Sequence, residues 1–176
     1  ILGESNLSTT TEELSHLADV LTDAACSIAH QQLGERYPVR PQTPYAVIGL
    51  GKLGGGELNY SSDIDIIIAY KDEGELTDVK GKTRTYHEYF NMFVEKLIVN
   101  LSESSGEGHL YRVDTRLRPE SGAGPLARSL QSFLLYYESR GELWERQMLI
   151  KARAVAGDLS FGDDFVRQVQ PFVYPR

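Results

Sequence analysis

Two short apolar runs on either side of a glycine-rich loop constrain the fold most strongly. Residues 45–50 and 64–70 have the length and composition of buried strands, and the second run is rich in β-branched side chains. Glycines at positions 49, 51, 54, 55 and 56 accompany the connection between them. The sequence therefore predicts a strand, a glycine-rich loop and a second strand.

Helical periodicity surrounds this strand pair. Apolar residues recur at spacings of three and four from Leu14 to Ala29, which predicts an amphipathic helix over about residues 12–33, with Thr10 and Glu13 as its capping box. Prolines at 38, 41 and 44 end this helix. Further helices are predicted at about residues 90–101, 129–140, 142–154 and 161–169, and a third strand at 110–117. The sum is a small sheet flanked by helices, an α+β or α/β arrangement.

The glycine loop matches known phosphate-binding patterns only in part. Residues 49–54 fit the G-x-G-x-x-G dinucleotide fingerprint, but that site needs a helix that begins in the loop, and only residues 57–63 leave room for one. Lys52 precedes the glycine cluster and no Ser or Thr follows it, so the Walker pattern is excluded. Three interpretations remain: a tight turn between strands, a loop whose backbone amides bind phosphate oxygens, and, disfavoured, a nicotinamide dinucleotide site.

Paired carboxylates follow the loop. Asp63 and Asp65 are two residues apart at the start of a strand, so their side chains share a face roughly 6 to 7 Å apart. This spacing suits a divalent cation such as Mg²⁺, although aspartates that cap turns at an exposed strand end are the alternative. Asp114 adds a third carboxylate, and in a regular strand Arg112, Arg116 and Arg118 would share its face. Three carboxylates beside a phosphate-binding loop predict metal-dependent phosphoryl or nucleotidyl transfer.

Charge and cysteine content exclude several other classes. The net charge of −7 argues against general binding of nucleic acid or of an anionic membrane. One cysteine, Cys26, excludes an internal disulfide framework and a multi-cysteine zinc site, so a cytoplasmic location is expected. No apolar run approaches the roughly 18 residues of a membrane helix, and no basic signal-peptide region opens the chain. The missing initiator Met leads us to expect a piece of a longer chain.

Three longer motifs resemble one known family. Residues 51–65, 113–119 and 144–153 occur in the order seen in glutamine synthetase adenylyltransferases, a branch of the nucleotidyltransferase superfamily that includes polymerase β. The resemblance covers about residues 47–158. It implies a polymerase β-like α+β fold with a small mixed sheet flanked by helices. It also implies a catalytic core at 45–158, preceded by a helix and proline-rich linker at 1–44 and followed by a helical segment at 159–176.

The resemblance also implies a function. Family members are bifunctional, Mg²⁺-dependent enzymes in which the amino-terminal half removes AMP from a glutamine synthetase tyrosine by phosphorolysis and the other half adds AMP from ATP. Residues 59–65 and 124–126 look closer to the amino-terminal half, so deadenylylation is favoured. The implied partners are glutamine synthetase, ATP, ADP and phosphate, with a PII signal protein acting through the full-length enzyme. The alternative is a non-catalytic nucleotide-sensing or partner-binding module with the same fold.

By position in the matching motifs, the resemblance implies roles for individual residues. The metal ligands and catalytic carboxylates would be Asp63, Asp65 and Asp114. The nucleotide or phosphate contacts would be Gly54, Gly55, Ser62, Lys52, Arg116 and Arg118. Arg116, Arg118, Lys151 and Arg153 are expected to contact phosphate or the protein substrate, and the resemblance does not fix their individual roles. Trp144 and Glu145 are expected to anchor a helix against the sheet. His87 and His109 lie outside the motifs and are interpreted as structural.

Overall fold

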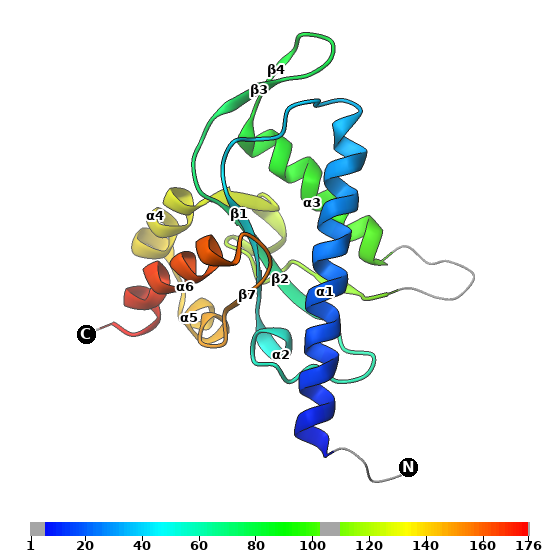
Figure 1. The fold of residues 1–176 in the computed structure, drawn as a ribbon. Helices are drawn as coiled ribbons and strands as arrows, with labels where there is room; N and C mark the ends of the chain where they lie inside the picture. The colour runs from blue at the N-terminus through cyan, green and yellow to red at the C-terminus, as the bar shows by residue number, and fades with distance from the viewer. Residues whose placement is uncertain (1–5, 103–109, 176) are drawn as a thin grey trace.

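A mixed five-stranded sheet forms the central layer of the computed structural model, which describes residues 6–102 and 110–175 (Figure 1). Its main path runs β5-β2-β1-β7, with β6 also paired to β2. β1 is antiparallel to β2 and to β7, whereas β5 and β6 run parallel to β2. The strand bounds are Tyr45–Gly49 (β1), Ile64–Tyr70 (β2), Val113–Asp114 (β5), Ala127–Ser129 (β6) and Arg153–Gly157 (β7).

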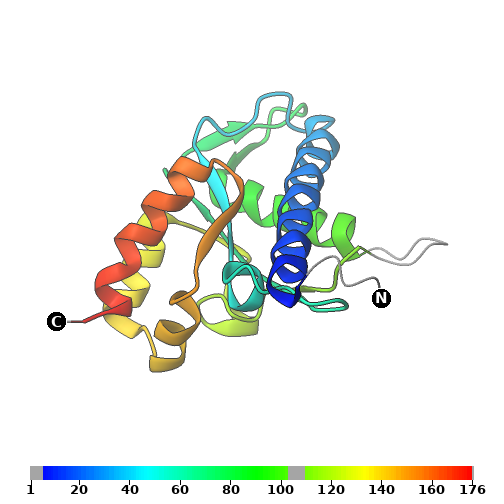
Figure 2. The same cartoon turned by 60° about the horizontal axis from the view of Figure 1, so that its bottom comes forward.

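Helices cover both faces of this sheet (Figures 1 and 2). α1 (Leu7–Gly34) and α3 (Tyr86–Ser102) pack together on one face. The other face carries α4 (Leu130–Arg140), α5 (Leu143–Leu149) and α6 (Leu159–Val173). The predicted small mixed sheet flanked by helices is therefore confirmed. The antiparallel pairing of β1 with β2 also excludes a Rossmann unit, in which those strands would be parallel.

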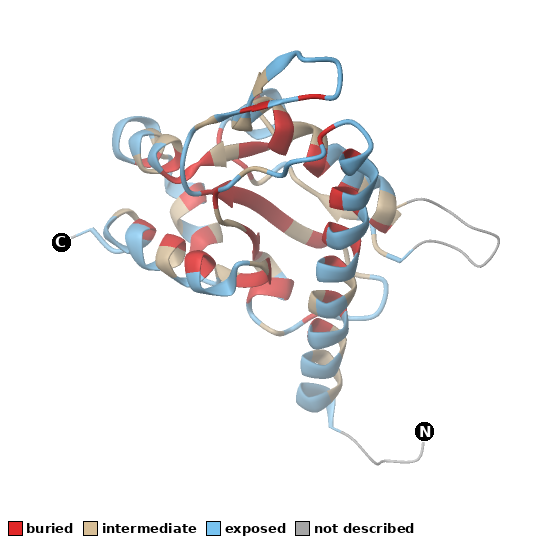
Figure 3. Cartoon of the chain, turned by 45° about the horizontal axis from the view of Figure 1, so that its top comes forward, coloured by how far each residue is buried: buried red, intermediate tan, exposed pale blue. Residues whose placement is uncertain are grey.

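The sheet is buried on both faces, as its apolar composition predicts (Figure 3). Alternate residues of one strand enter different clusters because successive side chains point to opposite faces. Val47 and Ile68 pack with α1 and α3, while Ile48 and Ile67 pack with α4 and α6. Phe165 of α6 is fully buried in the second cluster, so both flanking helical layers contribute to the core.

The first helix is confirmed, but its cap and its buried face differ from the prediction. The Asn6 side chain caps it by accepting a hydrogen bond from the Thr9 amide at 2.9 Å, so a capping box at Thr10 and Glu13 is wrong. Small residues line its buried face, while Leu17 and Ile28 are exposed. His30 reaches the opposing helix, where its Nδ1 lies 2.9 Å from the Tyr89 hydroxyl oxygen.

Two predicted elements near the carboxyl half are present but shorter than predicted. The strand predicted at 110–117 is regular only at Val113–Asp114, and the helix predicted at 142–154 ends at Leu149, after which β7 begins at Arg153. Trp144 is exposed and donates to Glu142 rather than anchoring a helix, whereas Glu145 is buried and caps the start of α5. A hairpin of β3 (Glu75–Thr77) and β4 (Thr83–Thr85) was not predicted.

The remaining predictions are the structural role of two histidines and the lack of a membrane helix. His87 is exposed on α3, and His109 lies outside the described residues. No helix in the described ranges has the length and apolar character that crossing a membrane requires.

Candidate active site

A one-turn helix, α2 (Gly51–Gly54), begins inside the glycine loop directly after β1. The expectation that only residues 57–63 could be helical is therefore wrong. Gly51 has φ +52°, a left-handed conformation that glycine adopts readily, and a Cβ there would lie 2.6 Å from Oδ2 of Asp65. Glycine is needed at this position because the backbone passes directly beside a carboxylate.

The amides of the predicted phosphate-binding glycines hold this turn together. Gly54 donates to the Leu50 carbonyl at 2.9 Å, and Gly55 donates to the Gly51 carbonyl at 3.1 Å. The amides that open a helix have no partner within it, and here they belong to Gly51, Lys52 and Leu53, of which Leu53 is fully buried. A Cβ on Gly54 would collide with the carbonyl oxygens of Lys151 and Gly49, so close packing requires glycine there.

The far side of the loop is fixed by α1 and β7. Arg153 pairs with Asp19 of α1 at 2.7 Å and donates to the Leu53 carbonyl at 3.0 Å. Lys151 forms an ion pair with Glu57 at 2.7 Å. The side chains of Lys151 and Arg153 thus support the loop from behind.

Three carboxylates meet where β2 and β5 pair. Asp65 of β2 lies opposite Asp114 of β5 in the parallel register, and Asp63 directly precedes β2. The pKa of Asp65 is raised, first by burial and then by the negative charges of Asp114 and Asp63. Charges from Arg116 and Lys52 oppose that rise. The predicted grouping of these three aspartates is therefore present as a group of electrostatically coupled side chains.

Arginines pair with two of these carboxylates. Arg112 donates from Nε and Nη2 to the two oxygens of Asp63, at 2.6 and 2.8 Å. Arg116 donates from Nη2 to Oδ2 of Asp114 at 2.6 Å and from its backbone amide to Oδ1 at 2.8 Å. The hydrogen bond from the Arg116 side chain is the largest cause of the lowered pKa of Asp114. The site thus holds negative charge that the two arginines balance in part.

Arg118 has a different position from the one that strand alternation predicts. Its guanidinium is buried and donates to the carbonyls of Gly124, Thr115 and Gly122, at 2.9, 2.7 and 3.0 Å. The chain leaves β5 after Asp114, and the Arg118 amide closes a turn onto the Thr115 carbonyl. Alternation therefore stops at Asp114, and Arg118 organises the loop that follows.

An open cleft of about 580 Å³ lies over Asp63 and Asp65, and Asp114 and Arg116 are not among its described lining residues. Of the predicted site residues, Lys52, Ser62, Asp63 and Asp65 line it together. Gly54 and Gly55 instead line a hollow of about 250 Å³ between the loop and α1. The cleft also includes residues with no predicted role, namely Asn59, Tyr60, Ser61 and Arg112.

The sequence contains partial signals for these additional cleft residues. Asn59 to Ser61 belong to the motif that carries the family resemblance, and Arg112 lies two residues before Asp114. Ser61 has φ +55°, an unfavourable conformation for a non-glycine residue that often marks a functional loop. The pairing of Arg112 with Asp63 joins segments 49 residues apart, so local spacing does not reveal it.

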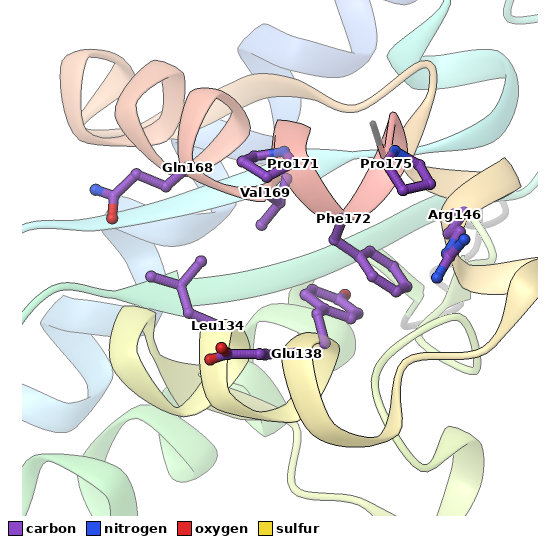
Figure 4. Close-up of a pocket in the computed structure, with 9 residues that line it drawn as sticks. Leu134, Glu138, Arg146, Gln168, Val169, Pro171, Phe172 and Pro175 are labelled. Carbon is purple, nitrogen blue, oxygen red and sulfur yellow. The ribbon is translucent and has the colours of Figure 1, made fainter.

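A second cavity, of about 380 Å³, lies between α4, α5 and α6 (Figure 4). Its wall includes the stacked rings of Tyr137 and Phe172, whose centroids are 4.8 Å apart, and the Arg146 guanidinium lies 5.0 Å from the Phe172 ring centre. None of the predicted site residues is among its described lining residues. The candidate active site is therefore the cleft at the carboxylates.

The chemistry of the donors suits a hard divalent cation, since carboxylate oxygens are the ligands that Mg²⁺ prefers. Across residues 6–102 and 110–175, no three ligand-type side chains are already close enough together to hold a metal ion. Asp63 and Asp114 are turned toward their arginines instead. The residues fit a magnesium site in the chemistry of their donors but not in their present spacing, and binding would require these two side chains to reorient.

Comparisons with known proteins agree with these motifs. The family model of glutamate-ammonia ligase adenylyltransferase matches residues 1–168. A bifunctional glutamine synthetase adenylyltransferase/adenylyl-removing enzyme of Thioalkalivibrio sulfidiphilus is 43% identical over 180 residues, which cover 99% of this chain and 18% of that protein. The proteins of the same name from Nitrosococcus oceani and Pseudomonas aeruginosa are 41% and 40% identical, over 100% and 97% of this chain and 19% and 18% of their own lengths. The chain thus spans about a fifth of the length of these curated relatives.

Proposed function

Because the chain belongs to the glutamate-ammonia ligase adenylyltransferase family, we propose that it is a nucleotidyltransferase domain that removes AMP from, or adds it to, a tyrosine of glutamine synthetase. The observation that carries this proposal is the meeting of three carboxylates beside the α2 turn, with Gly51 directly against Asp65. Such an arrangement would bring a backbone suited to phosphate oxygens next to carboxylates suited to a divalent cation.

Asp63, Asp65 and Asp114 are the proposed ligands of Mg²⁺. The cation, when bound, would supply Lewis-acid stabilisation of the phosphate oxygens. Lys52, Ser62 and the first amides of α2 would bind those oxygens. Arg116 would add positive charge at the rim, and Gly54 and Gly55 would keep the turn in the shape that binding requires. Arg118 would not touch the nucleotide but would hold the loop after Asp114 in place through its bonds to backbone carbonyls.

The proposed reaction exchanges one phosphorus–oxygen bond for another. In phosphorolysis, an oxygen of inorganic phosphate attacks the phosphorus of the AMP-tyrosine ester, the bond to the tyrosine oxygen breaks, and that oxygen takes up a proton as ADP leaves. In adenylylation, the tyrosine oxygen attacks the α-phosphorus of ATP, loses its proton, and pyrophosphate leaves. Asp114 would orient the attacking group. No covalent enzyme intermediate is needed in either direction.

We favour deadenylylation as the reaction of this domain. The support is the amino-acid sequence of residues 59–65 and 124–126, which resembles the amino-terminal half of the family enzymes. ATP, ADP, phosphate and a PII signal protein acting through the full-length enzyme are the proposed partners, and the cytoplasm is the proposed location.

The test is a pair of assays on the full-length protein that contains this chain. Asp63→Asn is expected to lower phosphate-dependent release of ADP from adenylylated glutamine synthetase by on the order of 100-fold, while AMP transfer from ATP continues. Asp164→Asn on α6 is the control, because it also removes a carboxylate paired with an arginine, but outside the cleft. Loss of AMP transfer with ADP release intact would reverse the proposed direction.

A non-catalytic module is the competing outcome. Calorimetry with ATP and ADP, with and without Mg²⁺, reports binding separately from turnover. If nucleotide binds and Asp63→Asn leaves both activities unchanged, the chain is a binding module and the catalytic proposal is wrong.

A further inference from the structure

We propose that Arg112 and Arg116 bind Asp63 and Asp114 through the same oxygens that a divalent cation would use. A cation that binds these carboxylates would therefore displace the two guanidiniums, an exchange of one cationic partner for another. This inference rests on the proposed function. It assigns to the two arginines the task of holding the carboxylates until a cation replaces them, and to Arg112 the further task of binding phosphate oxygens at the cleft once it is released.

The geometry of the pairs requires competition. Arg112 spans both oxygens of Asp63, with Nε at 2.6 Å and Nη2 at 2.8 Å. The side chain of Arg116 reaches both oxygens of Asp114, with Nε at 3.1 and 3.0 Å and Nη2 at 2.6 Å. A two-pronged guanidinium takes two of the roughly four lone-pair sites of a carboxylate, one on each oxygen. Mg²⁺ binds carboxylate oxygens at about 2.0–2.1 Å, and a cation that used both oxygens from the same side would need those two sites. The guanidinium and such a cation therefore compete.

Exposure indicates which partner would move. The side chains of Arg112 and Arg116 are 75% and 78% exposed, whereas those of Asp63 and Asp114 are 29% and 16% exposed. Exposed ion pairs contribute little to stability, so a guanidinium can leave at small cost. Arg118, two residues beyond Arg116, is the opposite case, because it is buried and bonded to three backbone carbonyls.

Charge balance favours the same exchange. Three carboxylates are balanced by the guanidiniums of Arg112 and Arg116 and the ammonium of Lys52, so the site has no net charge. One divalent cation would make the site positive if both arginines stayed in their pairs, and like charges at this range repel. Moving a guanidinium outward relieves the repulsion. Arg112 also lines the cleft, so after release its guanidinium remains where an incoming phosphate group would meet it.

The first experiment observes the arginines directly. Side-chain Nε–Hε NMR signals of the 176-residue chain are followed as Mg²⁺ is added. The signals of Arg112 and Arg116 are expected to move to the positions they have in Asp63→Asn and Asp114→Asn, respectively. Arg167 is the internal control, since it pairs with Asp164 at 2.5 Å and is also 75% exposed, but lies on α6. Its signal is expected to stay in place.

The second experiment measures Mn²⁺ affinity from the electron paramagnetic resonance of the free ion. Arg112→Ala is expected to bind Mn²⁺ about threefold to fivefold more tightly than the unmodified chain, the factor that corresponds to removing one exposed competing pair. Arg167→Ala is expected to leave the affinity unchanged. Weaker binding by Arg112→Ala would mean that Arg112 positions Asp63 for the metal, and would overturn the exchange.

The outcomes separate this inference from the proposed function. Saturable Mn²⁺ binding with unmoved Arg112 and Arg116 signals overturns the exchange alone and leaves the metal site in place. Lack of saturable binding, or binding that Asp65→Asn does not weaken, overturns the metal-dependent function and the exchange with it.

Discussion

The charge of one side chain at this site, Asp65, lowers the stability of the folded chain. Asp65 lies partly buried between two other carboxylates, and that environment raises its pKa. A negative charge held in this way destabilises the folded chain, because the unfolded chain separates these charges and hydrates them. Arg112 and Arg116 offset the charge on the two neighbouring aspartates through direct bonds, and the charge of Arg116 also acts on Asp65.

Replacing Asp65 by Asn is therefore expected to stabilise the chain while it removes activity. The free energy of unfolding should rise, since the substitution removes a repelled charge with little change in shape. Urea denaturation at pH 7 measures this. The control, Asp164→Asn, loses a favourable pair with Arg167 and should gain nothing. An Asp65→Asn chain that is less stable than the unmodified one would contradict the repulsion.

His30 gives the fold a dependence on pH. Burial, followed by the charge of Arg40, lowers the pKa of His30 from 6.5 to about 4. Between these values the unfolded chain takes up a proton that the folded chain excludes, so the contribution is complete above pH 6.5 and is lost as the pH falls toward 4. The loss should reach ~3 kcal/mol. Urea unfolding at pH 7 and 4.5 is expected to show a smaller difference for His30→Gln than for the unmodified chain, and equal differences would refute the assignment.

Among the secondary-structure elements, the α2 turn requires a glycine, Gly54, because there is no space for a Cβ at that position. Gly54 and Gly34 both end helices, but a Cβ on Gly54 would meet backbone carbonyls, while one on Gly34 would have no atom within 4 Å. Gly54→Ala is expected to lower the free energy of unfolding by about 1–3 kcal/mol, and Gly34→Ala to change it by less than about 1 kcal/mol. Thermal unfolding of the two variants measures this contrast. Similar melting temperatures would show that the loop can move aside.

The helices and strands were predicted correctly where the local sequence determines the secondary structure, and incorrectly where pairing with a distant segment determines it. The long helices, β1 and β2 follow from periodicity and β-branched runs. Ala154 and Ala156 have little local preference for a strand, and they join β7 because the segment pairs with the edge of β1. The site follows the same rule. The motif places Asp63 and Asp65, but the partners of Asp63 and Asp114 depend on where β5 stops.

At the scale of the whole molecule, the two flanking segments belong to the packing of the core. α1 contributes Ala18, Ala25 and Ala29 to one cluster, and α6 contributes Phe165 to the other. The division at residues 44 and 158 stays a prediction about sequence organisation.

A chain restricted to residues 45–158 is expected not to fold cooperatively, because each face of its sheet loses a covering helix. Urea titrations followed by Trp144 fluorescence and circular dichroism should give one shared transition for the 176-residue chain and a gradual change for the shorter one. A sharp, shared transition in the shorter chain would establish 45–158 as an autonomous unit.

The parallel pairing of β2 with β5 also has a kinetic consequence. Asp65 and Asp114 are separated by 49 residues along the chain, with the whole of α3 between them. Closing so long a loop is entropically slow, and contacts of this kind form late relative to the local hairpin of β1 and β2. The carboxylates therefore come together only after the transition state for folding, when most of the core has formed. Their repulsion destabilises the native state but not the transition state, so it raises the unfolding rate and hardly changes the folding rate.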